Sequence, residues 1–313
     1  TGAATTIANL SNTELVKVTQ GGAANTDYAL NMISATGVEN VMSRLSTGEV
    51  SFDNLQNLVG VHAYGTQAGA NVTASFLNSL ASGTGDSVNL IIDGGANATF
   101  QVSGTTATNE FETINLASNG TSANTVSIKD AGGNNPAGLK TYNVSGSAKL
   151  TQTLAGGASK ATFDASTATG VQAVTWGGNY TTLKTGSAAD KIVAAGSFFG
   201  STNPKTVDGG DGTDTLAIDA SVTSLASNAT GVKHSVANVE TLEIDAKLAN
   251  GGVADLAVTV EADLFSVGSY KIDAANLDAT AAGGGGEDVT VTINDLGSET
   301  VTMAFNASGT NTN

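Results

Sequence analysis

The chain has 313 residues, including 39 glycines, two prolines and no cysteine. Because no disulfide can form, packing or a bound metal has to hold the fold together. The formal net charge of −16 at pH 7 argues against nucleic acids and anionic membrane surfaces as partners, since their phosphates attract basic surfaces.

The hydropathy pattern predicts no transmembrane segment, since no apolar run reaches the roughly 18–20 residues that span a membrane. Residues 1–4 (TGAA) lack the basic and apolar regions of a signal peptide. We interpret the chain as a mature or excised portion of a longer protein.

The first hundred residues contain several short strand candidates. Residues 7–18 (IANLSNTELVKV) alternate apolar and polar side chains, which predicts a strand. Residues 38–45 and 52–59 have an apolar spacing that fits either a helix or a strand. Residues 88–92 (VNLII) follow a glycine-acid turn at 83–86, which we interpret as a plain corner rather than a cation site.

A similar strand pattern then recurs at loose intervals. It is found at 111–116 (FETINL), 139–144 (LKTYNV), 171–176 (VQAVTW) and 239–244 (VETLEI), and the first three copies begin 28 and 32 residues apart. Repeats of this length are typical of stacked coils that bury one continuous face. The pattern predicts an all-β fold of stacked strands, a parallel β-helix or β-solenoid.

Residues 207–218 (VDGGDGTDTLAI) join a glycine-aspartate turn to an alternating apolar strand. The glycines at 209, 210 and 212 allow positive φ angles that turn carbonyl oxygens inward, and Asp214 adds a carboxylate. Such an oxygen set suits Ca²⁺, which takes six to eight oxygen ligands. The segment therefore predicts a Ca²⁺-binding turn whose strand is anchored in the core by Leu216.

A second, degenerate copy of this turn lies at 185–193 (TGSAADKIV) and begins 24 residues earlier, at 185 rather than 209. The full copy resembles the Gly-Gly-x-Gly-x-Asp nonapeptide of RTX repeats. Both turns lie between the segments FDAS (163–166) and VETL (239–242), and the order of these elements over about 163–246 resembles the calcium-dependent S-layer proteins of Gram-negative bacteria. The resemblance covers roughly a quarter of the chain.

This resemblance implies a β-solenoid that folds with Ca²⁺ outside the cell after type I secretion, and that associates laterally into a homo-oligomeric lattice. Lipopolysaccharide or another surface polysaccharide would be bound through parts not in this chain. The implied Ca²⁺ ligands are the backbone carbonyls of Gly209, Gly210 and Gly212, the carboxylate of Asp214, the neighbouring acids Asp208 and Asp211, and Gly186 with Asp190 in the degenerate copy.

Near the C-terminus, four glycines at 283–286 predict a flexible joint before strands at 289–293 and 300–305. We therefore divide the chain into three predicted portions. These are a β-rich N-terminal portion at 1–100, a β-solenoid with RTX-like turns at 101–250, and a β-rich C-terminal portion at 251–313.

The sequence offers little material for catalysis. His62 and His234 are its only histidines, and neither lies in a His-Glu-x-x-His zinc motif. A cluster of aromatic residues is expected to pack in the core rather than to bind sugars; its members are Trp176, Tyr180, Phe198 and Phe199. We predict no catalytic residues and no enzymatic activity.

The sequence therefore predicts a secreted structural protein at the cell surface, the subunit of a Ca²⁺-dependent two-dimensional S-layer. Two alternatives stay open. One is an RTX-type adhesin fragment that binds glycans. The other is a carbohydrate-active β-helix enzyme that uses acid pairs such as Glu261 and Asp263.

Overall fold

The computed structural model describes residues 5–6, 10–22, 27–106, 108–130, 132–195, 203–219, 234–245, 256–262, 265, 267–273 and 289–304. It forms two compact units, Thr1–Tyr180 and Thr181–Asn313. Strand makes up 54% of the structure and helix only 2%, and the strands pair in parallel as stacked coils. The predicted β-solenoid is therefore confirmed.

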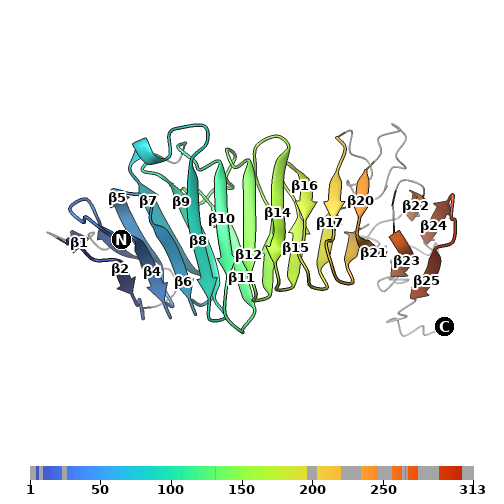
Figure 1. Cartoon of the computed structure of the whole chain (residues 1–313), viewed down its shortest axis with the longest axis horizontal. Coiled ribbons are helices and arrows are strands. Elements are labelled where there is room, and N and C mark those ends of the chain that lie inside the picture. Colours follow the sequence, from blue (N-terminus) through green and yellow to red (C-terminus); the bar gives the residue numbers. More distant parts are fainter. Residues whose placement is uncertain are drawn as a thin grey trace, which may run out of the picture. The chain divides into compact units, whose positions relative to one another are not determined.

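In the first unit the chain alternates between two parallel sheets, and each strand pairs with the strand two places along the chain (Figure 1). A short 3₁₀ helix, η1 (Asn78–Leu80), follows β7. One sheet contains β1 (Thr5–Thr6), β3 (Tyr28–Asn31), β5 (Val50–Leu55), β7 (Ala70–Phe76), β9 (Asn97–Gly104), β11 (Asn124–Lys129), β13 (Leu150–Thr153) and β15 (Gln172–Trp176). The other contains β2 (Leu15–Val18), β4 (Asn40–Arg44), β6 (Gly60–Tyr64), β8 (Ser87–Asp93), β10 (Thr113–Ser118), β12 (Thr141–Gly146) and β14 (Ala161–Ala168).

The second unit repeats the same alternation. One set of paired strands contains β17 (Lys191–Ala195), β19 (Thr215–Asp219), β21 (Val239–Asp245), β23 (Val267–Asp273) and β25 (Thr300–Ala304). A second set contains β16 (Tyr180–Lys184), whose first residue is the last of the first unit, together with β18 (Thr206–Asp208) and β20 (Ser235–Ala237). A separate pair is formed by β22 (Leu256–Glu261) and β24 (Val289–Asn294).

Alternation along each strand produces the core. In β12, Tyr142 and Val144 are buried, whereas Thr141 and Asn143 between them are only partly buried. Successive coils then place similar side chains in one column, so the Tyr142 ring meets Phe163 edge to face at 5.5 Å between centroids. Such pairs add to the burial of apolar surface that drives folding.

The recurring strand pattern is confirmed in part. Strands β10 and β12 pair with Thr113 opposite Thr141, which is the predicted 28-residue step. The 32-residue step is wrong, because residues 172–176 form β15 in the other sheet. On the side away from β10, β12 pairs with β14, which places Phe163 opposite Tyr142. The connections through the opposite sheet differ in length, so no constant period exists.

Other sequence predictions can be placed on the same framework. The two ambiguous segments at 38–45 and 52–59 contribute to strands β4 and β5. The segment at 88–92 lies in β8, and that at 289–293 lies in β24. Residues 300–304 of the last predicted strand form β25, and residue 305 lies outside the described residues. Of the strand predicted at 7–18, the structure describes β2, whereas 7–9 and the glycines at 283–286 lie outside the described residues. Residue 100, a predicted boundary, lies inside β9.

A buried asparagine shows how a polar side chain is accommodated in the coil. Asn124 is fully buried, and its Oδ1 accepts hydrogen bonds from the backbone N–H groups of Gly95 and Ala96, both at 3.1 Å. Its Nδ2 donates to Ser118 Oγ at 3.0 Å and to the Asn119 carbonyl at 3.1 Å. Every polar atom of this amide therefore has a partner, as a buried amide requires.

Neighbouring residues of β13 test the assigned register. Leu150 is fully buried and Thr151 is exposed on the opposite face. We expect Leu150→Ala to lower the free energy of unfolding in urea by about 2–5 kcal/mol, because it removes buried methyl groups and leaves a cavity. The matched variant Thr151→Ala should change it by less than about 0.5 kcal/mol. Equal losses would show that the register of β13 is shifted by one residue.

Candidate cation site at a stacked corner

The two glycine-aspartate turns of the sequence lie directly on top of each other. Strand β17 pairs with β19 so that Lys191 lies opposite Thr215, which places Asp190 beside Asp214. Between the turns, the Asp211 N–H donates to the Gly186 carbonyl at 3.0 Å. The 24-residue spacing therefore corresponds to one complete coil, which includes both β17 and β18.

Three acidic side chains form a ladder along this corner. Asp190 Oδ2 accepts a hydrogen bond from the Gly186 N–H at 3.0 Å within its own turn. Asp214 Oδ1 accepts from the Asp190 N–H at 2.7 Å, and Glu240 Oε2 accepts from the Asp214 N–H at 2.6 Å. Each carboxylate of the later coils thus binds the backbone of the coil before it.

Asp214 is the member of the ladder with an unsatisfied oxygen. Asp214 is only 1% exposed, and its Oδ2 has no hydrogen-bond partner in the protein. Burial, opposed by the hydrogen bond from the Asp190 N–H and assisted by the nearby carboxylates of Asp190, Glu240 and Asp208, raises the pKa of Asp214 to about 6. A buried carboxylate in these surroundings favours a proton or a cation close to it.

The glycines of the turn have a separate structural explanation. Gly210 and Gly212 have φ angles of 84° and 128°, which favour glycine. A Cβ on Gly210 would collide with the Gly186 carbonyl oxygen of the coil below, and one on Gly212 would collide with that of Ala188. A Cβ on Gly209 would lie 2.8 Å from Asp214 Oδ2. Close stacking therefore accounts for the glycine pattern without any metal.

Two of the remaining predicted ligands, Asp208 and the Gly209 carbonyl, are engaged in other contacts. Asp208 Oδ1 accepts hydrogen bonds from Asn238 Nδ2 at 2.7 Å and from the Gly210 N–H at 3.3 Å. The Gly209 carbonyl accepts from Thr185 Oγ1 at 2.7 Å, and the Asp211 side chain is exposed. Within the described residues, no group of three or more His, Cys, Asp or Glu side chains forms a metal cage.

Glu240 is the one member of the ladder that the sequence did not single out. It immediately precedes Thr241, which lies opposite Thr215 in the pairing of β19 with β21. Glu240 therefore takes the position in its coil that Asp214 takes in the coil before. Glu240 belongs to the recurring strand pattern VETLEI at 239–244, but only the register of β19 with β21 places it beside Asp214.

The histidines and the aromatic cluster lie elsewhere. His62 is on β6, and burial lowers its pKa. His234 is buried, and its Nδ1 accepts a hydrogen bond from the Lys205 N–H at 3.2 Å. Trp176 and Tyr180 are both buried, as predicted, and Trp176 Nε1 donates to the Tyr180 carbonyl at 3.2 Å. Phe198 and Phe199 lie outside the described residues.

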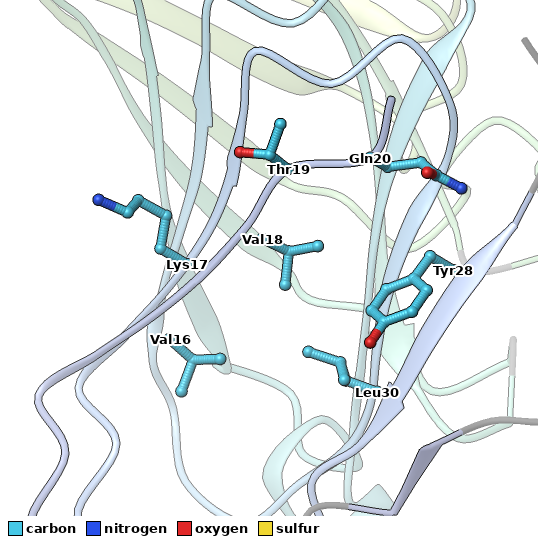
Figure 2. A pocket seen from close by; sticks show the side chains of 7 residues that line it. All are labelled: Val16, Lys17, Val18, Thr19, Gln20, Tyr28 and Leu30. Carbon is cyan, nitrogen blue, oxygen red and sulfur yellow. The ribbon is translucent and has the colours of Figure 1, made fainter. Parts of the chain in front are cut away.

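A groove that the sequence did not predict lies between β2 and β3. It has a volume of about 500 Å³ and is lined by residues 16–20 together with Tyr28 and Leu30. Figure 2 shows Val18 directed toward Tyr28 while Lys17 points away from them. Tyr28 is 40% exposed. The lining combines apolar and neutral polar side chains around one lysine, and it contains no acid or histidine.

Comparison with known proteins leaves the function to be argued from this geometry. No family model, curated protein or solved structure matches the chain. Among the described residues, no helix has the length and apolar character needed to cross a membrane. The stacked corner is therefore the best-defined candidate site in the described part of the chain.

The raised pKa of Asp214 predicts a pH dependence in the absence of divalent cations. The native state binds this proton more tightly than the unfolded chain, so its contribution to stability is fully present below about pH 3.8 and is lost as the pH rises through about 6. With a chelator present, we expect Asp214→Asn to reduce the fall in the free energy of unfolding between about pH 4 and 7.5 by up to about 3 kcal/mol.

Urea unfolding at several pH values measures this effect. Asp211→Asn is the matched control, since Asp211 belongs to the same turn but is exposed. Its pH dependence should follow that of the unmodified chain. If Asp214→Asn also left the pH dependence unchanged, the Asp214 carboxylate would not be buried as described.

Proposed function

We propose that this chain is a structural subunit of a secreted, Ca²⁺-dependent surface layer. The observation that carries the proposal is the buried, unpartnered Oδ2 of Asp214 within the acidic ladder. Stacking explains the glycines of the turn, but it gives no reason to bury a carboxylate oxygen without a partner. A cation beside this oxygen supplies that reason.

The residues at the corner suit a hard, oxygen-seeking ion. Asp214 would hold it through Oδ2, and the turn carbonyls of Gly209, Gly210 and Gly212 would supply further neutral oxygens. Because the described acidic side chains do not form a cage by themselves, carbonyl oxygens and water have to complete the six to eight ligands of Ca²⁺. When bound, Ca²⁺ supplies charge neutralisation and a link between stacked coils.

Net charge connects this site to assembly. Copies carrying a formal charge of −16 repel one another. A divalent cation that neutralises carboxylates reduces this repulsion, and a rigid stack of coils presents regular faces from which symmetric contacts can repeat. We propose that association into the layer is homo-oligomeric and depends on Ca²⁺. Secretion by a type I route and attachment to a surface polysaccharide rest on the S-layer resemblance over about 163–246.

Calcium titration tests the cation site. We expect Ca²⁺ to raise the free energy of unfolding in urea by about 2.7 kcal/mol at a free concentration a hundred times the dissociation constant. Asp214→Asn should abolish most of this gain, because it removes the charge that the ion neutralises. Asp211→Asn should retain it, and Mg²⁺ should stabilise less because Mg²⁺ gives up its water reluctantly. Equal stability with Ca²⁺ and with chelator would rule out the site.

Assembly is measured separately, by light scattering and electron microscopy of the purified chain with Ca²⁺ or with chelator. Growth of ordered two-dimensional sheets in Ca²⁺, diminished in Asp214→Asn, is the expected result. A chain that gains stability from Ca²⁺ but stays monomeric would keep the cation site and remove the surface-layer function.

A further inference from the structure

A small cavity lies inside the first unit, where two facing sheets contribute polar side chains to an otherwise apolar core. Its polar lining includes Tyr142 from β12, Gln152 from β13 and Tyr180. Val126, Ile128 and Leu154 form part of its apolar wall. The space open to the centre of a water molecule is about 10 Å³, which is room for one water.

Three polar atoms of these side chains lack a partner in the protein. They are Tyr142 Oη and both amide atoms of Gln152, Oε1 and Nε2. Tyr142 is 2% exposed and Gln152 is 4% exposed, so bulk water does not reach them freely. An unsatisfied buried amide or hydroxyl is costly. The fully bonded amide of Asn124 in the same unit shows the usual solution.

The chemistry of the lining defines the ligand. Burial, followed by the influence of the neighbouring Tyr180, raises the pKa of Tyr142 well above its usual value, so its hydroxyl stays protonated and can donate. Gln152 offers one acceptor and a donor group. The ligand therefore has to donate and accept at once. The lining carries no charged side chain, which disfavours an ion in this apolar surrounding.

We propose that this cavity binds one ordered water molecule, which bridges Tyr142 and Gln152 and thereby links the two sheets of the coil through hydrogen bonds. Water can donate two hydrogen bonds and accept two, and buried waters typically make about three. The site is a structural hydration site within the core. It is independent of the proposed cation site, since its lining shares no residue with the stacked corner.

A high-resolution crystal structure of the unmodified chain tests the proposal directly. We expect a single water peak at about 3 Å from Tyr142 Oη and from an amide atom of Gln152. A map with no peak there would overturn the proposal, as would a peak too large or too electron-rich for water. In Gln152→Leu, whose apolar side chain can neither donate nor accept a hydrogen bond, we expect the peak to be lost.

A double-mutant cycle with Tyr142→Phe and Gln152→Leu provides a second measurement in solution. Each single variant should lower the urea midpoint, because it leaves the other polar group without its full network. The double variant removes both groups, so its loss should be smaller than the sum of the two single losses. Additive losses would overturn the bridge. If a variant fails to fold, water-to-protein magnetisation transfer in NMR spectra of the unmodified chain still decides the question.

Discussion

Parallel stacking of coils in register is the constraint on which the rest of this structure depends. Each strand hydrogen-bonds to equivalent positions of the coils before and after it, so a residue shares its column with near neighbours from other parts of the chain. Apolar columns then form a continuous core. For the same reason an acidic residue repeated at one corner places like charges together, as in Asp190, Asp214 and Glu240.

The column arrangement gives buried polar groups three outcomes in this protein. Asn124 is satisfied entirely by nearby backbone and side-chain groups. Asp214 is satisfied on one oxygen only, beside other carboxylates that disfavour its charge. Tyr142 and Gln152 meet at a cavity of molecular size. The first case is complete within the protein, whereas the second favours a proton or the cation that we propose, and the third fits the water molecule that we propose.

The polar contacts between coils are compatible with the structural role that we propose. Asp214 and Glu240 accept hydrogen bonds from backbone N–H groups of the coil before, and His234 accepts a hydrogen bond from the Lys205 backbone. These contacts use the polar groups to fix one coil against the next. A cation at the corner would act in the same direction, because it would stabilise stacked turns whose charge otherwise opposes stacking.

Sequence alone determined the all-β class, the alternation within strands and the turn at 207–218, since these depend on local spacing and on the freedom of glycine. Tertiary structure decided which strands are neighbours. Strand β12 pairs with β14 rather than with β15, whose sequence pattern is similar to that of β12. Glu240 lies next to Asp214 because β19 pairs with β21. Local periodicity could not show this, because register depends on how many residues the chain uses to cross the opposite sheet. The unpartnered oxygen of Asp214 is likewise a product of that register.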